Sequence, residues 1–384
     1  MERDLRDQLD RMVSELRDRG CVRTDAVAEA FRSVPRDRFL PAGSRQRAFV
    51  VDEAIPTHFD DEGVSISSSS APSIMAVMLE MLDVRPGHRV LEIGAGTGYN
   101  AALLDRLVGP RGRVVSIDVN PTAASEAESH LSAIGIRQAR IVVGDGWAGI
   151  DGATVDRIVV TAESWGISPY WVRQLRDGGV LVLPLWLRPG LTLAVAFEKV
   201  GETLQSRSVA FCGFMPLRGP HGGPPRRTVV RGWPDSSGSD DRLRWIAVFD
   251  DASATRIGIL EELLRRVPTV AAAPPLSPGW NVRLSLEEPD PIGLYRLEGK
   301  FRGAFGLFDA GRGSLAMVEG EHLLGFGDPR CRERLEQALS SATPVDLLTD
   351  LGITVLPHPS AAPGGIVLPR GDFDLVIQVD SPAG

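Results

Sequence analysis

The first half of the chain alternates between apolar residues at helical spacing and short, continuous apolar runs. Apolar positions between residues 5 and 16 follow helical spacing, and Gly20 ends this predicted helix. Thr24 or Asp25 is placed to cap a second helix, which ends near Phe31. The chain therefore starts with a helical segment, before any strand pattern begins.

A strand and helix alternation follows this segment. The prolines that bound residues 34–41 predict extended backbone, and a helix is predicted over 73–82. Apolar runs then predict strands at 89–93, 112–118, 140–143, 156–161 and 179–184. Two further runs, 191–199 and 205–211, have the pattern of an antiparallel pair. This order predicts an α/β fold: a doubly wound, Rossmann-like sheet that ends in a hairpin.

The composition changes at residues 218–225, where glycine and proline predict a linker. Beyond it we expect helices near 258–266 and 331–340, strands near 280–286, 294–297 and 314–318, a charged loop at 234–242 and a proline-rich loop at 268–278. The predicted domains are thus residues 1–220 and 226–384. The second is expected to be a small α+β domain, and it carries no recognisable catalytic motif.

The glycines that follow the strand at 89–93 predict a ligand site. Gly94, Gly96 and Gly98 open a helix, so the turn can adopt positive φ angles and a ligand can touch bare backbone beside free N–H groups. Dinucleotides and S-adenosylmethionine both use such turns. The dinucleotide pattern places its third glycine one residue later and has no acid like Glu92 ahead of the turn. That acid suits a cationic aminoacyl end better than a pyrophosphate.

Two further acids follow the next strands. Asp118 ends a strand at a position suited to a ribose diol, and Asp145 lies between glycines where it can accept from an adenine amino group. Taken in order with the glycine turn, these acids favour a methyltransferase. The alternative is a doubly wound sheet whose glycines only make tight turns and whose acids are solvated strand ends.

Composition limits the remaining possibilities. The chain has 384 residues, 43% of them hydrophobic, and a net charge of -8, which opposes binding to nucleic acid. It contains no apolar run long enough to span a membrane, and its charged N-terminus is unlike a signal peptide, so we expect a cytoplasmic protein. Cys21, Cys212 and Cys331 are widely spaced single residues, which indicates neither a disulfide framework nor a metal site.

A serine run at 67–70 precedes Ala71, Pro72 and the helix over 73–82. By itself the run fits a flexible linker or a helix cap. In its setting, however, residues 5–217 resemble the protein-L-isoaspartate O-methyltransferases. The matching stretches are the Arg19-Gly20 turn with Thr24-Asp25, VPRDRFLP at 34–41, AFVVDEAIP at 48–56, SSSAP at 68–72, VLEIGAGTGYNAALL at 90–104, GDG at 144–146, QLRDGGVLVLP at 174–184 and FMPLRG at 214–219.

The resemblance implies a carboxyl O-methyltransferase that uses S-adenosylmethionine and no metal. Ala71 and Pro72 fix the register of the family's serine motif, so its catalytic serine corresponds to Ser70. The implied cofactor-binding residues are Ser68, Glu92, Gly94, Ala95, Gly96, Thr97, Asn100, Asp118, Val119, Asp145, Gly146 and Thr161.

The chain departs from the family pattern at 59–63, at 161–167 and in its long C-terminal extension. This extended, serine-rich form resembles the tailoring methyltransferases of lanthipeptide and graspetide pathways. That resemblance implies a cyclised ribosomal peptide as partner, an aspartyl ester that collapses to an aspartimide or isoaspartate, and a C-terminal domain that recognises the peptide. Two alternatives stay open: a general isoaspartate repair enzyme, and a non-catalytic module that retains a cofactor pocket.

Overall fold

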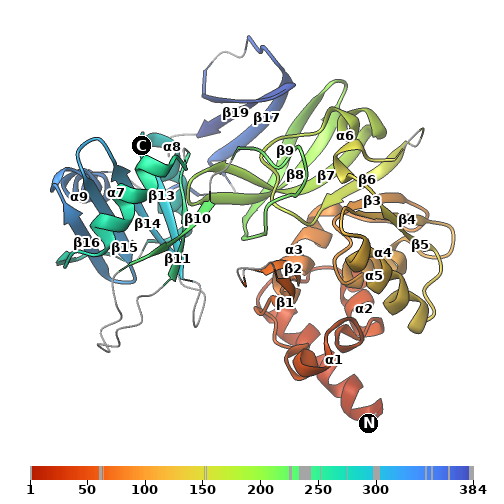
Figure 1. The fold of residues 1–384 in the computed structure, drawn as a ribbon. Helices are drawn as coiled ribbons and strands as arrows, with labels where there is room; N and C mark the ends of the chain where they lie inside the picture. The colour runs from red at the N-terminus through yellow and green to blue at the C-terminus, as the bar shows by residue number, and fades with distance from the viewer. Residues whose placement is uncertain are drawn as a thin grey trace. The chain divides into compact units, whose positions relative to one another are not determined.

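The chain folds into two compact units (Figure 1). The computed structural model describes residues 2–59, 63, 65–150, 152, 154–224, 227–232, 244–250, 252–274, 276–296, 303–341, 344–346, 349–361 and 364–379. The first unit comprises Met1–Leu185, Leu193–Gly222 and Gly352–Ile377. The second comprises Trp186–Thr192, Gly223–Leu351 and Gln378–Gly384.

A ten-stranded sheet forms the centre of the first unit, in the order β18-β19-β17-β9-β8-β7-β6-β3-β4-β5. Its strands are β3 (Arg89–Ile93), β4 (Arg113–Asp118), β5 (Ala139–Val143), β6 (Val155–Val160), β7 (Leu175–Arg188), β8 (Leu191–Val200), β9 (Thr203–Phe211), β17 (Leu351–Pro357), β18 (Ile366–Arg370) and β19 (Phe373–Val379). Strands β3 to β7 pair in parallel, and β8 pairs antiparallel with β9. The predicted α/β class is confirmed.

Helices cover the parallel strands. They are α3 (Pro72–Leu82), α4 (Tyr99–Val108), α5 (Pro121–Ala133) and α6 (Pro169–Gln174), with a 3-10 turn η3 at Gly146–Ala148. Helices α4 and α5 pack on β3, β4 and β5 (Figure 1). The alanines and leucines of α4 are buried. The parallel strands are mostly apolar in their interiors, as expected of strands covered on both faces.

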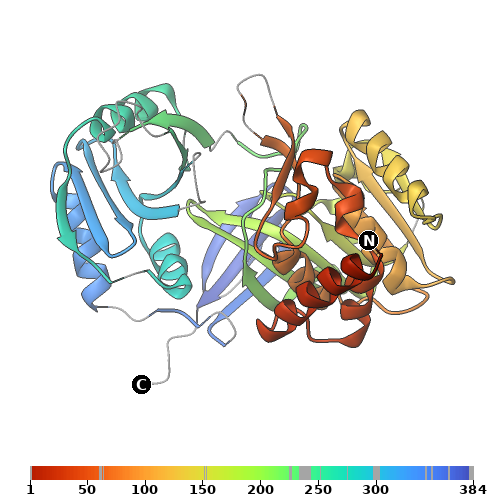
Figure 2. The same cartoon turned by 90° about the horizontal axis from the view of Figure 1, so that it is seen from below.

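The N-terminal helices α1 (Glu2–Asp18) and α2 (Asp25–Ser33) pack against α3 and α4, and are red in Figure 2. Thr24 caps α2 by accepting a hydrogen bond from the amide of Val27, as its position in the sequence predicts. The prediction of extended backbone over 34–41 is confirmed at Val34, Pro35 and Leu40 and is wrong for Arg36–Phe39. Two 3-10 turns, η1 (Arg36–Phe39) and η2 (Ala42–Arg47), follow Pro35 and Pro41, because proline φ also suits the start of a helical turn.

The serine run belongs to a hairpin formed by β1 (Ile55–Phe59) and β2 (Ser65–Ser69). Neither a linker nor a serine cap describes it, because the run pairs as a strand and the N-cap of α3 is Ala71. Pro72 occupies the first turn of α3, where its missing N–H is not needed. Part of the acidic insertion at 59–63, residues 60–62, lies outside the described residues.

The second unit is built on a seven-stranded antiparallel sheet in the order β10-β11-β13-β14-β15-β16-β12. Its elements are β10 (Arg227–Arg231), β11 (Arg244–Val248), α7 (Ala254–Leu264), β12 (Thr269–Ala272), α8 (Pro278–Glu287), β13 (Pro291–Arg296), β14 (Gly303–Asp309), β15 (Ser314–Glu319), β16 (His322–Gly327) and α9 (Arg330–Ser341). Phe308 packs in the cluster beneath α7, and its neighbour Leu307 packs in the cluster beneath α9, so each face of the sheet has its own core.

One strand prediction in this unit is wrong. Residues 280–286 form helix α8, although Trp280, Val282, Leu284 and Leu286 alternate in the way a strand would. Pro278 at the helix start and the buried Ser285, whose hydroxyl donates to the Pro189 carbonyl, favour the helix. Part of the proline-rich loop expected at 268–278 is strand β12, and the charged loop expected at 234–242 lies outside the described residues.

The division of the C-terminal strands between the two units differs from the predicted domain boundary. Residues 226–384 were expected to form one domain, but Gly352–Ile377 lies in the first unit. There β17 pairs antiparallel with β9 through Thr354–Gln205 and Val355–Leu204. The extension therefore contributes three strands to the sheet that also carries the glycine turn.

Candidate active site

The predicted ligand residues gather at one edge of the parallel sheet. In the register of the strands, Ile93 is level with Ile117 on β4 and with Val160 on β6, and Asp118 is level with Val143 on β5. The carboxyl ends of β3, β4, β5 and β6 therefore meet at the same edge. In open α/β sheets, this edge is where ligands bind.

The glycine turn has the backbone that the sequence predicts. Gly94, Gly96 and Gly98 have φ of 96°, 52° and 84°, a region that other residues rarely adopt. A Cβ at Gly94 would lie 2.5 Å from Oγ1 of Thr161, and one at Gly98 would lie 3.1 Å from Ala127 on α5. A Cβ at Gly96 would meet only the Ser68 carbonyl, at 3.6 Å. The first and third glycines thus allow close packing, and the second keeps a stretch of backbone open.

Glu92 lies fully buried beneath this turn. Its Oε1 accepts a 2.7 Å hydrogen bond from the side-chain amide of Asn100, while Oε2 has no hydrogen-bond partner among the described residues. Burial raises the pKa of Glu92 to about 7, and the nearby negative charge of Asp118 adds to this, whereas Ser116 and Asn100 lower it. A buried carboxylate with one vacant oxygen suits a cationic group of a ligand.

Asp118 connects the end of β4 to the glycine turn. Its Oδ2 accepts from the Gly96 amide at 2.9 Å, and its Oδ1 accepts from the Asn120 amide at 2.9 Å. Val119 beside it is exposed, as a residue lining a ligand would be. Within the turn, the side chains of Ala95 and Thr97 are buried.

Thr161, just past β6, closes the opposite side of the turn. Its hydroxyl lies 3.0 Å from the Ile93 carbonyl and 2.6 Å from the Gly94 carbonyl, and it donates to them.

Asp145 and Gly146 follow β5, where Asp145 caps η3 by accepting from the Trp147 amide at 2.9 Å. A Cβ at Gly146 would lie 2.4 Å from the side chain of Ile93, so only glycine fits there.

The Trp147 ring adds an aromatic group that the sequence analysis did not select. It stacks on His221 with ring centroids 4.7 Å apart and also contacts Trp171, whose Nε1 donates to the Gly146 carbonyl at 2.8 Å. The aromatic character of Trp147 next to the GDG motif was the signal available in the sequence. Its stack with a residue more than seventy positions away was not readable there.

The serine hairpin borders the glycine turn, since the Ser68 carbonyl is the atom that faces Gly96. Ser70 lies between β2 and α3 and is partly exposed. The helix-start amide of Ser73 is not available to a substrate, because it donates to the Val51 carbonyl at 2.9 Å. Pro72 has no amide hydrogen, so only Ala71 of this group remains to serve a substrate.

Arg36 and Arg370 are the other side chains that the sequence analysis missed. Arg36 is fully buried and donates to the carbonyls of Ser69 and Ser70 at 3.1 Å and 2.9 Å. Arg370, on β18, places its guanidinium 4.6 Å from the ring centroid of Trp165 in the segment after β6. In a sequence both read as ordinary charged residues, because the partner segments are remote along the chain.

These residues fit S-adenosylmethionine. The vacant Glu92 oxygen suits the aminoacyl end, Asp118 suits the ribose and Asp145 suits the adenine. The open backbone at Gly96 leaves room for the ligand. Among the described residues, no group of histidine, cysteine and acidic side chains is arranged to hold a metal ion. Fold and site together define an S-adenosylmethionine-dependent methyltransferase of the doubly wound class.

The family follows from comparison with known sequences. The family described as Protein-L-isoaspartate(D-aspartate) O-methyltransferase (PCMT) matches residues 7–221. The chain belongs to this family. A protein-L-isoaspartate O-methyltransferase of Methanopyrus kandleri is 39% identical over 215 residues, which are 56% of this chain and 92% of the relative. That of Methanothermobacter thermautotrophicus is 35% identical over 218 residues, 56% of this chain and 97% of the relative.

The likeness in fold extends beyond the matched sequence. A solved protein-L-isoaspartate O-methyltransferase covers 90% of this chain and 96% of its own, with a TM-score of 0.52 and 23% sequence identity. Since the family match ends at residue 221, this fold similarity includes much of the C-terminal region. None of the helices in the described ranges is long and apolar enough to cross a membrane.

Proposed function

We propose that this chain methylates the free α-carboxylate of isoaspartyl residues in peptides and proteins, which is the general repair activity. The observation that carries the proposal is the position of the serine motif. The backbone at Ser68 borders the open glycine of the turn, and Ser70 follows at the start of α3. The family match and the relatives support this activity at least as well as any specialised one.

The chemistry demands position more than acid or base catalysis. S-adenosylmethionine supplies a methyl group attached to a positively charged sulfur. The acceptor carboxylate, with an ordinary pKa near 4, is already ionised at neutral pH, so the chain need not remove a proton. Holding the reacting groups in line can contribute roughly 7–11 kcal/mol. Ser70 donates to the acceptor carboxylate in this proposal, and the Ala71 amide is available for its second oxygen.

The cofactor residues carry separate tasks in the same proposal. Glu92 holds the cationic aminoacyl end, Asp118 the ribose and Asp145 the adenine, while the glycine turn admits the ligand to bare backbone. Ser68, Ala95, Thr97, Asn100, Val119, Gly146 and Thr161 complete the lining. The burial of Glu92 and the hydrogen bonds of Asn100 and Thr161 support these proposed roles.

A second candidate function is the modification of one cyclised ribosomal peptide. The contact between Arg370 and Trp165 favours it, because the C-terminal strands reach the segment where the chain departs from the family pattern. The product ester would have a better leaving group than a carboxylate. Attack by the next backbone nitrogen would then expel methanol and close a five-membered imide, an aspartimide, without help from the enzyme. In this candidate, residues 226–384 choose the peptide.

One assay separates the candidates. The full-length chain is incubated with labelled methyl donor and three acceptors: an isoaspartyl peptide, its aspartyl counterpart and a macrocyclic precursor peptide. Methylation of the isoaspartyl peptide alone supports repair. Methylation restricted to the macrocycle supports the tailoring function. Retention of donor without turnover of any acceptor would indicate the non-catalytic module.

A further inference from the structure

The guanidinium of Arg36 joins separate backbone segments next to the serine motif. Arg36 opens η1 and is fully buried. Its Nη1 donates to the Ala48 carbonyl at 3.0 Å, and its Nε lies 3.3 Å from the hydroxyl of Ser69. Its Nη2 lies 3.1, 3.1 and 2.9 Å from the carbonyls of Glu53, Ser69 and Ser70.

A buried guanidinium lowers the stability of the fold relative to an apolar side chain of similar size. We therefore ask what Arg36 provides that an apolar side chain could not. Its hydrogen-bond acceptors are neutral carbonyls and a hydroxyl, and no ion pair of Arg36 forms with the described residues. Burial accordingly lowers the pKa of Arg36 to about 10, which leaves it charged at neutral pH. The rigid fork of a guanidinium, however, can fix several carbonyls at once.

Arg36 contacts the backbone where the strand pairing of the hairpin ends. The last registered pair of the β1–β2 hairpin is Ile55 with Ser69, so Ser70 lies one residue beyond it. The carbonyl of Ser70 receives its hydrogen bond from Arg36 instead. On the other side, Ser68 borders Gly96. Arg36 thus sets how the serine motif approaches the glycine turn.

We propose that Arg36 is a positioning residue for methyl transfer, which holds the 69–70 backbone so that the Ser70 hydroxyl meets the acceptor carboxylate. This inference rests on the role proposed above for Ser70. Arg36 itself is buried behind the motif and acts through it. The same residue type would serve a repair enzyme and a tailoring enzyme alike.

The test variant is Arg36→Lys, which keeps the charge and loses the fork. With an isoaspartyl peptide as acceptor, we expect kcat to fall on the order of 10- to 100-fold, with donor affinity in calorimetry changed less than about twofold. Ser69→Ala removes a single hydrogen-bond acceptor of Arg36 and is a milder second variant. It should lower kcat in the same direction by a smaller factor, and it keeps the inference testable if Arg36→Lys does not fold.

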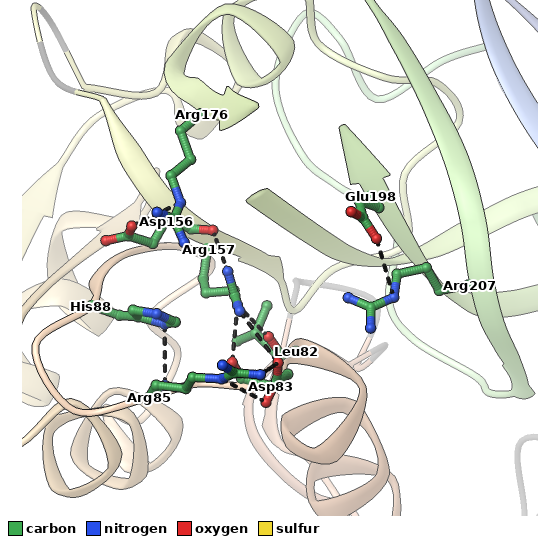
Figure 3. A network of polar contacts seen from close by, with 9 residues as sticks. All are labelled: Leu82, Asp83, Arg85, His88, Asp156, Arg157, Arg176, Glu198 and Arg207. Carbon is green, nitrogen blue, oxygen red and sulfur yellow. Dashed lines mark hydrogen bonds and ion pairs between the residues drawn. The ribbon is translucent and has the colours of Figure 1, made fainter. Parts of the chain in front are cut away.

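Arg157 provides a matched control. It is also buried and donates to the backbone carbonyls of Leu82, Asp83 and Asp156 (Figure 3). It lies near the amino end of β6, whereas the candidate site lies at the carboxyl ends of the strands. Arg157→Lys should lower thermal stability to a similar extent and leave kcat unchanged. Equal losses of kcat in the two lysine variants would overturn the inference, since both would then report stability alone.

A double-mutant cycle tests the route through Ser70. If Arg36 acts through this hydroxyl, adding Arg36→Lys to Ser70→Ala should lower kcat little further. If the two residues act independently, their fold-losses in kcat should multiply. Amide hydrogen exchange gives a readout without turnover. Arg36→Lys should speed exchange of the 68–71 amides and leave β3 and β4 protected, and unchanged exchange would overturn the inference. If the wild-type chain does not methylate the peptide, the proposed function fails, and the exchange result still decides the role of Arg36.

Discussion

The Gly96 amide donates a 2.9 Å hydrogen bond to Oδ2 of Asp118, which links the glycine turn after β3 to the end of β4. The two residues lie 22 positions apart in the chain and at neighbouring strand ends in the sheet. Each carboxylate oxygen has two lone pairs, so Asp118 can hold the turn and still accept from a ribose hydroxyl. The same acid therefore shapes the turn and has the capacity left for its proposed contact with the ribose.

Asp118→Ala should weaken binding of S-adenosylmethionine by about 1.5–3 kcal/mol, because it removes charge-assisted hydrogen bonds and loosens the turn. Calorimetry with the folded variant measures this. Asp156→Ala is the control, since Asp156 accepts from the Arg89 amide at the other end of the strands and should leave donor affinity unchanged. Unaltered affinity in Asp118→Ala would remove this residue from the site.

Substitutions at two glycines of the turn should separate an effect on donor binding from an effect on packing. Gly96→Val should abolish donor binding in folded protein, because a branched side chain occupies open ligand space at a φ of 52°. Gly98→Ala should instead cost roughly 1–3 kcal/mol of stability, since its Cβ lies 3.1 Å from Ala127, and should affect binding less. Urea unfolding and calorimetry on both variants distinguish the effects. Donor binding by folded Gly96→Val would show that the turn is misassigned.

The raised pKa of Glu92 predicts a dependence of stability on pH. Because its pKa rises from 4.5 to about 7 on folding, the folded state binds the proton more tightly than the unfolded state. The stabilising contribution is complete below about pH 4.5 and disappears as the pH rises through about 7; it is on the order of 3 kcal/mol. Glu92→Gln should remove this dependence in ligand-free protein, as judged by urea unfolding between pH 5 and 8.

Donor binding offers an independent check on Glu92. A cation beside its free oxygen favours the ionised form, so binding near pH 6 should release a proton. Calorimetry in buffers of different ionisation enthalpy would detect the release in wild type and its loss in Glu92→Gln. A stability profile identical in the two proteins would show that Glu92 is ionised throughout.

The strands and glycine turn of the catalytic sheet were predictable because their signals are local. Apolar runs bounded by turns predicted β3 to β9, and Glu92, Gly94 and Asp118 follow directly from motif spacing. The addition of β17 to the edge of β9 was not predictable, since pairing across about 150 residues has no local pattern. At 280–286 a local pattern was present but ambiguous. The apolar alternation is typical of a strand, yet a helix also tolerates this alternation when the flanking residues favour a helix start.

In the candidate site, too, residues in local motifs could be selected from the sequence, whereas residues that depend on remote segments could not. Ser70 followed from the register that Ala71 and Pro72 impose, whereas Arg36 did not, because a charged residue in VPRDRFLP looks exposed. Its burial depends on carbonyls supplied by segments folded around it. Satisfied buried charges are set by tertiary structure, so sequence patterns miss them.

Ser70→Ala should lower kcat roughly 10- to 100-fold and leave donor affinity nearly intact, because its proposed partner is the charged acceptor. Ser67→Ala is the matched control within the same run. Ser67 pairs with His58 inside the hairpin, and its carbonyl accepts from the Ser65 hydroxyl, so its own hydroxyl should matter little. Equal losses in both variants would mean that the register of the motif is misassigned.

The last prediction concerns the C-terminal strands. Removing residues 226–384 would uncover the edge of β9 that β17 pairs with, so a point variant is the cleaner test. Arg370 stacks on Trp165, and a Cβ at Gly166 would lie 3.4 Å from the Arg370 side chain, so β18 borders the segment after β6. We predict that a cation at this position favours an acceptor peptide with acidic residues.

Arg370→Ala should therefore weaken use of the peptide acceptor by about 0.5–2 kcal/mol in kcat/KM and leave donor affinity unchanged. The control is Arg173→Ala, whose guanidinium lies the same 4.6 Å above the ring of Tyr170 on α6. If both variants lose activity equally, Arg370 has no special part in acceptor choice. Comparing acceptors then decides between the functions: a loss confined to a macrocyclic precursor supports tailoring, whereas efficient methylation of short linear isoaspartyl peptides by the full-length chain supports repair and rules tailoring out.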